Sequence, residues 1–336
     1  MFIEEIVTEA VLSGASDIHI VSGLPVKCRV DGKIRSMTEA AATPELCLEI
    51  AKELAGGEYE KIADIGELDL AKTFSDGTRT RINLFRQQGQ VSAAIRILND
   101  RIPEIEELGL PPVAEKLPDY PNGIVLIVGE TGSGKSTTLA AVLNRINHRR
   151  NAHIITLEDP IEYVYVPDRC VINQREIGKD TRSYADGLRS ILREDPDVIL
   201  IGEMRGRNTI ETALTAAETG HLVFSTLHTN SAAESIDRIV SVFPEGQQQE
   251  VRTQLAATLR VVIAQQLLPK VGGGRAAACE VMVVNDAIRN LIREGKTQQI
   301  NSYIGMNSRE GSILMEAALR KLEQAGILKK EEGDRQ

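Results

Sequence analysis

The spacing of apolar positions predicts a small domain at the start of the chain. Residues 2–12 and 45–55 each place their apolar side chains on one helical face, and Gly14 ends the first helix. Alternating apolar and polar positions predict strands joined by hairpin turns, of which Asp31-Gly32 is the clearest. The expected strands are 18–20, 26–30, 33–35, 68–74, 78–85 and 91–98. Residues 1–98 are therefore expected to form an α+β domain on a PAS-like antiparallel sheet.

The rest of the chain has a different pattern. Five of the twelve prolines fall in residues 99–122, so this segment is expected to be a linker. From 123 to about 330, apolar runs alternate with helical periods, which is typical of an α/β domain with a mainly parallel sheet. The expected strands are 123–128, 153–158, 198–202, 222–226 and 276–284. The expected helices are 181–193, 207–219, 246–268, 286–295 and about 309–325, and the charged end 329–336 is expected to fray.

The totals limit the classes of function. The 336 residues are 42% apolar and 26% charged, as in soluble globular proteins. A net charge of −9 argues against a large basic face for nucleic acid, although a local basic patch stays open. No uncharged apolar run reaches the ~18 residues of a membrane span, and the acidic start does not resemble a secretory signal. The four cysteines lie far apart without a C-x-x-C pair, which favours free thiols in a cytosolic chain over a zinc site.

One segment matches a phosphate-binding pattern. Residues 129–136 fit G-x-x-x-x-G-K-[ST] at every fixed position. An apolar run precedes the match and a helical period follows it, which argues against a chance glycine turn. Lys135 is expected to reach the β- and γ-phosphates, and the Ser136 hydroxyl to hold Mg²⁺. The expected nucleotide contacts are Gly129, Glu130, Thr131, Gly132, Ser133, Gly134, Lys135, Ser136 and Thr137.

Carboxylates follow two of the predicted strands. The strand 198–202 leads to Glu203, and this order is typical of an acid that meets Mg²⁺ through water, although an acidic turn after a core strand would look the same. Glu158, Asp159 and Glu162 lie at the end of another strand, where a carboxylate can orient or deprotonate the attacking water. Taken alone, this second group also fits a solvated acidic loop. The spacing does not decide which of the three acids faces the γ-phosphate.

Two histidines and three arginines are further candidate site residues, and each can have more than one role. His221 and His228 flank one apolar strand, where each can sense the γ-phosphate, hold the structure or respond to pH. Arg79 and Arg81 share the polar face of one predicted strand, and Arg96 lies on the next. Such arginines are usually solvated, but an arginine finger inserted into a neighbour's nucleotide site is worth about 10³–10⁵ in rate.

Taken together, these motifs resemble the family of hexameric secretion and type IV pilus motor ATPases. The resemblance covers nearly the whole chain, from Ala15 to about Leu328. Residues 287–294 are similar to a C-terminal motif of the pilus-retraction subfamily. This resemblance implies a chain without the leading domain and the four-cysteine insertion common in extension and type II secretion ATPases. The four ordered boxes that carry the resemblance are 129–136, 157–163, 199–205 and 219–229.

The resemblance implies a RecA-like P-loop ATPase domain that uses ATP and Mg²⁺. It implies a cytoplasmic homohexamer at the base of the pilus machine, joined to the inner membrane through a platform protein, whose ATP hydrolysis powers pilus retraction and twitching motility. Nucleotide would lie between the N-terminal domain of one subunit and the C-terminal domain of another. No nucleic-acid partner is expected.

The resemblance also assigns roles to individual residues. It implies that Glu162 activates water, that Glu203 is linked to Mg²⁺, and that Glu158 and Asp159 support the metal. His221 and His228 would sense phosphate or position domains, and fingers would come from among Arg79, Arg81 and Arg96. An accessory retraction paralogue, an extension or secretion ATPase, a nucleic-acid motor and a non-catalytic scaffold stay open as alternatives.

Overall fold

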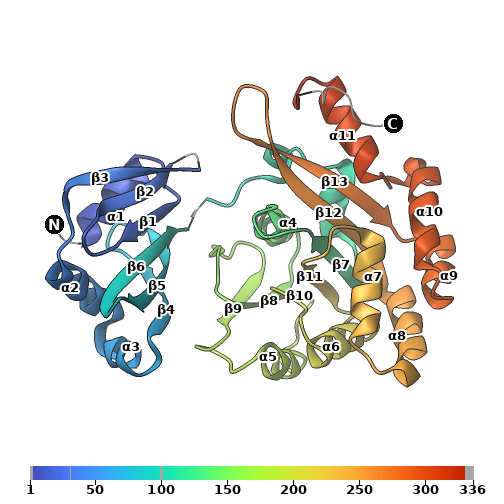
Figure 1. Ribbon diagram of the computed structural model, residues 1–336. Coiled ribbons are helices and arrows are strands. Elements are labelled where there is room, and N and C mark those ends of the chain that lie inside the picture. Colours follow the sequence, from blue (N-terminus) through green and yellow to red (C-terminus); the bar gives the residue numbers. More distant parts are fainter. Residues whose placement is uncertain (1–2, 31, 99–100, 330–336) are drawn as a thin grey trace. The chain divides into compact units, whose positions relative to one another are not determined.

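The computed structural model describes residues 3–30, 32–98 and 101–329 (Figure 1). The chain divides into two compact units, Met1–Arg101 and Ile102–Gln336. The predicted turn at Asp31, the first two residues of the predicted linker and the predicted fraying of 330–336 lie outside the described residues.

The first unit is an antiparallel sheet with helices on one face, as its sequence pattern predicts. The strand order is β3-β2-β1-β6-β5-β4, and every neighbouring pair is antiparallel. The apolar positions of the strands form one core with the apolar faces of the helices. The strands are β1 Asp17–Ile20, β2 Pro25–Val30, β3 Lys33–Ala41, β4 Glu67–Thr73, β5 Arg79–Gln87 and β6 Gln90–Ile97. The helices are α1 Ile3–Leu12, α2 Pro44–Ala55 and α3 Tyr59–Ile65, the last of which the sequence pattern did not predict.

The second unit contains a seven-stranded, mainly parallel sheet. Its order is β13-β12-β7-β11-β10-β8-β9, and only the pair β12 and β13 is antiparallel within the described residues. The parallel strands end at one common edge, so the segments that follow them lie near one another. The strands are β7 Gly123–Val128, β8 His153–Glu158, β9 Val171–Glu176, β10 Val198–Ile201, β11 Leu222–Leu227, β12 Leu259–Pro269 and β13 Arg275–Val283.

Helices cover both faces of this sheet, which confirms the α/β prediction. Alternate side chains of β7 enter two different cores: Ile124 and Leu126 pack with helices α5 to α10, whereas Val125 and Ile127 pack with α4. A strand buried on both faces needs a continuous apolar run, and this is why β7 has no polar position. The helices are α4 Lys135–Arg149, α5 Tyr184–Ile191, α6 Arg207–Glu218, α7 Ala232–Ser241, α8 Glu245–Thr258, α9 Asp286–Arg293, α10 Ile300–Met306 and α11 Met315–Gln324.

The single long helix predicted over residues 246–268 is wrong. Helix α8 ends at Thr258, and β12 begins at Leu259 and pairs in parallel with β7. Short apolar runs fit a buried helix or a buried strand equally well by periodicity. The β-branched residues Val261, Val262 and Ile263 favour the strand, and the backbone groups along that edge of β7 need hydrogen-bond partners.

Part of the predicted linker packs on the second core. Residues Ile105–Leu108 and Pro112–Asp119 form two 3₁₀ helices, and Val113 and Leu117 are buried against α4 and the sheet. Pro112 lies at the first position of its helix, where the missing N–H costs nothing. The contacts therefore divide the chain between Arg101 and Ile102 rather than at the end of the proline-rich run.

Three further features concern the whole described chain. Strand β9 and helices α7 and α10 were not predicted, although α7 buries one apolar face through Ala232, Ile236 and Val240. All four cysteines are buried free thiols, and burial raises the pKa of Cys279 to about 12. Among the described helices, none has the length and apolar character needed to cross a bilayer.

Candidate active site

The glycine loop joins β7 to α4 at the carboxyl edge of the second sheet. All six residues of β7 are buried, and α4 begins at Lys135 with Gly134 as its N-cap. The first N–H groups of a helix have no partner within the helix, and the helix start carries partial positive charge. The predicted order of strand, loop and helix is present, and it aims these N–H groups at the loop.

Two glycines of the loop are required by close contacts and by positive φ angles. Gly129 has φ 144°, and a Cβ there would lie 2.3 Å from the carbonyl oxygen of Gln265. Gly134 has φ 89°, and a Cβ there would lie 2.7 Å from Nε2 of Gln265. A side chain at either position would require the loop or the strand β12 to shift.

Lys135 is folded back onto the loop. Its Nζ donates hydrogen bonds to the carbonyl oxygens of Gly129 at 2.7 Å and Glu130 at 2.8 Å, and the residue is 9% exposed. Burial lowers the pKa of Lys135, and the negative charges of Glu203 and Glu162 partly oppose this shift. The structure therefore brings the P-loop lysine and two of the predicted acids into one electrostatic environment.

Hydroxyl groups surround the same loop. The Oγ of Ser133 is buried and has no hydrogen-bond partner within the described residues, a situation that a phosphate oxygen would relieve. Ser136 is exposed in the first turn of α4. The hydroxyls of Thr137 and Tyr163 lie 2.9 Å apart, and this contact ties α4 to the segment that carries Glu162.

Glu203 lies just beyond the end of β10 with its carboxylate held from two directions. Its Oε2 is 2.8 Å from Nε of Arg205, and its Oε1 is 3.6 Å from Nε2 of His228, which follows β11. The Glu203 side chain is 18% exposed. The adjacent carboxyl ends of β10 and β11 thus bring together a predicted metal acid and a predicted sensor histidine.

The three acids at the end of β8 have different surroundings. The Oε1 of Glu158 accepts hydrogen bonds from the Thr156 hydroxyl at 2.6 Å and from Nε2 of Gln174 at 3.2 Å. Burial raises the pKa of Glu158 in spite of these bonds. Asp159 and Glu162 are exposed. Glu158 is therefore engaged by its own sheet, whereas the other two acids are on the surface beside the P-loop edge.

Comparison with known proteins identifies the family of this chain. Residues 1–273 match the family model described as type II/IV secretion system protein. The chain belongs to this family. It is 44% identical over 335 residues to the type IV pilus retraction ATPase PilT of Pseudomonas aeruginosa, an alignment that covers 98% of this chain and 96% of that protein.

Another protein and a solved structure are also similar to this chain. A twitching motility protein of Neisseria gonorrhoeae is 48% identical over 263 residues, covering 78% of this chain and 70% of that protein. The crystal structure of the pilus retraction motor PilT with bound ADP has a TM-score of 0.92 and 46% identity, covering 98% of this chain and 95% of that one. This likeness confirms the predicted fold class.

The other predicted histidine of this family member, His221, does not lie at the edge of the sheet that carries His228. His221 precedes β11, and its Nδ1 is 2.8 Å from the carbonyl oxygen of Ala216 and 3.2 Å from the Thr219 hydroxyl. The six residues of β11 span roughly 20 Å, so His221 is at the opposite edge of the sheet from His228. The structure therefore does not bring His221 to the P-loop of its own chain.

The three predicted arginines lie on the first unit of this family member. Arg81 on β5 is directly opposite Arg96 on β6, and Arg96 Nε forms an ion pair with Asp17 Oδ1 at 2.9 Å. Arg81 and Arg96 are exposed, and Arg79 is partly buried. Because Thr80 and Ile82 point into the core, the alternation of the strand holds Arg79 and Arg81 on the solvent face.

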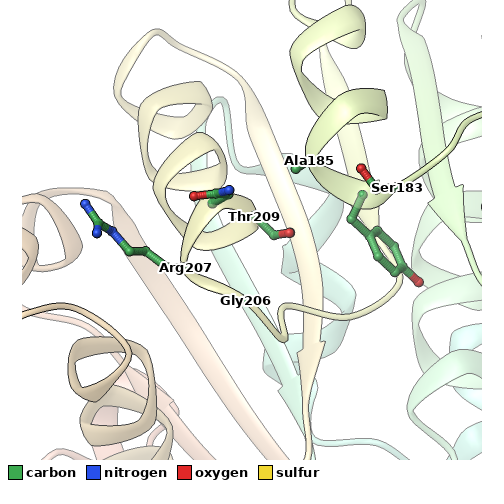
Figure 2. Close-up of a pocket in the computed structure, with 7 residues that line it drawn as sticks. Ser183, Ala185, Gly206, Arg207 and Thr209 are labelled. Atoms are coloured by element: carbon green, nitrogen blue, oxygen red, sulfur yellow. The ribbon is translucent and has the colours of Figure 1, made fainter.

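A pocket of about 370 Å³ opens beside the segment that carries Glu203. Figure 2 shows that its walls come from the starts of α5 and α6, with Ser183 on one side and Thr209 on the other. A Cβ on Gly202 would lie 3.0 Å from the Tyr184 hydroxyl, which places this pocket next to the end of β10. Its lining contains no carboxylate and none of the predicted site residues; the lining residues are Ser183, Tyr184, Ala185, Gly206, Arg207, Asn208 and Thr209.

Two residues at the loop were missed by sequence reasoning. Tyr163 lies inside the acidic box, and its hydrogen bond to Thr137 has no local sequence signal. Gln265 contacts the loop directly, but residues 246–268 were predicted as one helix. A strand prediction for residues 259–269 would have placed Gln265 beside β7, and this was the one signal that could have found it.

Proposed function

We propose that this chain is a Mg²⁺-dependent ATPase that powers the retraction of type IV pili. The observation that carries the enzymatic part is the convergence of Lys135, Glu162 and Glu203 at one glycine loop. The names of two relatives support the pilus part, since one is a retraction ATPase and the other a twitching motility protein. Residues 287–294, in and just after α9, add the resemblance to the retraction subfamily.

In this proposal the nucleotide phosphates bind at the glycine loop. The N–H groups of the loop and of the first turn of α4 donate to phosphate oxygens. Lys135 exchanges its two carbonyl partners for the β- and γ-phosphates, and the Ser133 hydroxyl gains a partner. The contacts are those of the predicted set, Gly129, Glu130, Thr131, Gly132, Ser133, Gly134, Lys135, Ser136 and Thr137.

Oxygen donors near the loop fit Mg²⁺. Ser136 and Glu203 would hold the ion, the latter partly through water, and Glu158 and Asp159 would support it from the end of β8. Bound Mg²⁺ neutralises charge on the β- and γ-phosphate oxygens. Arg205 and His228 orient the Glu203 carboxylate through their contacts with its two oxygens.

Glu162 is the proposed base for the attacking water. It is exposed and its charge acts on Lys135, whereas Glu158 is held by Thr156 and Gln174. His228 would respond to the γ-phosphate through Glu203. His221, a strand length away, is assigned the second role that the family resemblance implies, that of positioning domains.

Arg81 is the arginine that we propose as a finger. Arg96 is already paired with Asp17, while no ion pair of Arg81 occurs among the described residues. The Arg81→Ala variant is expected to lower kcat for ATP by about 10³-fold or more, because an arginine finger stabilises charge that develops in the transition state. Phosphate release measured over a range of ATP concentrations separates kcat from KM.

The control for Arg81 lies on the same strand. Arg86 is exposed at the end of β5 and has no assigned role, so Arg86→Ala is expected to keep the parent kcat. An Arg81→Ala protein with the parent kcat would exclude Arg81 as a finger and leave Arg79 and Arg96 as candidates.

We also propose the assembly that the family resemblance implies. The active form is a homohexamer at the cytoplasmic face of the inner membrane, joined to the platform protein of the pilus machine. Nucleic acid is not a partner. Lack of stimulation of ATP hydrolysis by DNA supports this assignment, and stimulation would favour a nucleic-acid motor instead.

Deletion of the gene tests the retraction function. Cells without a retraction motor are expected to carry abundant pili but to lose twitching, because pilin is assembled and not withdrawn. Counting surface pili by electron microscopy and measuring twitching zones gives both readouts. Loss of all pili would identify an extension motor, and retained twitching would identify an accessory paralogue; either result contradicts the proposal. Expression of the parent chain should restore twitching, and the Lys135→Ala variant should not.

A further inference from the structure

Gln265 joins the P-loop to the neighbouring strand. It lies on β12, next to β7, and is 3% exposed. Its Nε2 donates a hydrogen bond to the carbonyl oxygen of Ser133 at 2.8 Å. Its Oε1 accepts a hydrogen bond from the Thr138 hydroxyl at 2.8 Å. One buried amide therefore holds both the loop and the first helical turn that follows it, and neither end of the amide can rotate without losing a bond.

The bond to Ser133 fixes the direction of the next N–H group. The peptide bond between Ser133 and Gly134 is trans, so the Ser133 carbonyl and the Gly134 N–H point to opposite sides of the peptide plane. With the carbonyl held against Gln265, the N–H of Gly134 is directed away from β12 into the loop. No hydrogen bond within the described residues uses this N–H group. It is therefore available to an anion.

Two glycines of the loop lie against Gln265, Gly134 against its side chain and Gly129 against its backbone. A Cβ on Gly134 would lie 2.7 Å from Nε2 of Gln265, and a Cβ on Gly129 would lie 2.3 Å from the Gln265 carbonyl oxygen. Both contacts are closer than side-chain carbons tolerate. Gln265 thus lies directly beneath the loop, and the motif glycines permit this approach.

We propose that Gln265 is a positioning residue that sets the Gly134 N–H for the nucleotide phosphates without touching the nucleotide. This inference rests on the proposed binding of nucleotide at the P-loop. A phosphate that stays bound through the reaction gains from this N–H equally before and during the chemical step. Loss of the interaction therefore weakens binding and raises KM more than it lowers kcat.

The test replaces Gln265 by Met in the full-length chain. Methionine has a similar length and shape but supplies neither hydrogen bond. The dissociation constant for ADP and the KM for ATP with Mg²⁺ are expected to rise about tenfold, as for the loss of one well-placed hydrogen bond, while kcat changes less than about threefold. Gln266→Met is the matched control, since Gln266 is the next residue of β12 and is exposed; it should keep the parent values.

A purely structural role predicts a different result. A destabilised but correctly shaped site lowers the active fraction, which reduces apparent kcat and leaves KM and ADP affinity unchanged, and that outcome would overturn the proposal. If Gln265→Met does not fold, Thr138→Val removes only the donor to Oε1 and is expected to raise the ADP dissociation constant about two- to fivefold; an unchanged constant would also overturn it. Absence of ADP binding by the parent chain would instead refute the proposed function.

Discussion

The Glu162→Gln variant is expected to lose ATP hydrolysis by about 10²–10⁴-fold while it still binds nucleotide. The amide preserves the size of the side chain but cannot take a proton from water. Glu162 is exposed beside the P-loop edge, and its charge acts on Lys135. Steady-state phosphate release reports the rate, and titration with a fluorescent ADP analogue reports binding.

A second glutamate provides the matched control for this change. Glu115 is exposed on the 3₁₀ helix Pro112–Asp119 and has no assigned role, so Glu115→Gln should retain the parent rate within about twofold, as is usual for surface changes. Hydrolysis by Glu162→Gln at the parent rate would show that Glu162 is not the base. Asp159→Asn would then be the next variant to measure, because Asp159 is the other exposed acid of the segment.

Replacing Lys135 by Ala is expected to reduce the rate of hydrolysis by about 10²–10³-fold or more and to weaken nucleotide binding. The lysine is the cation that we assign to the β- and γ-phosphates, and alanine supplies no charge. Burial lowers the pKa of Lys135, so its removal also removes a desolvated cation, and the variant is expected to fold. Thermal unfolding with and without ADP tests this directly: ADP should raise the Tm of the parent and not that of the variant.

The control for Lys135 and a test of the ring use the same preparations. Lys116 is exposed in the second unit, so Lys116→Ala should keep both the rate and the ADP-dependent Tm shift.

Light scattering of the parent chain with ATP should give the mass of a hexamer. A chain that stays monomeric with nucleotide and hydrolyses ATP at the full rate would contradict the proposed motor, and Lys135→Ala activity near the parent level would contradict the P-loop assignment.

The meeting of Lys135, Glu203 and Glu162 could be anticipated from the sequence. Each of these residues follows an apolar run of the kind that forms a parallel strand, and such strands end at one edge of the sheet. The order of the strands in the sheet was not predictable, because β7, β11, β10 and β8 are neighbours in space but do not follow one another in this order in the sequence. That order decides that His228 reaches Glu203.

Other parts of the fold were not predictable for an equally physical reason. The apolar run after Thr258 fits a helix or a strand by itself, and only the open edge of β7 decides for the strand. Proline-rich residues before 122 have the composition of a linker, yet Val113 and Leu117 find an apolar surface on α4. In both cases the deciding partner lies elsewhere in the sequence.

The sequence by itself determined the α+β and α/β units, the phosphate loop, the acids at the strand ends and the family resemblance. These features depend on the spacing of residues within one or two elements, where backbone geometry sets the pattern. The tertiary structure alone decided which candidates meet: it joined His228 to Glu203, kept His221 a strand length away and placed Gln265 under the loop. Gln265 and Ser133 are 132 positions apart, and a contact over that distance arises from strand order and packing rather than from any local pattern.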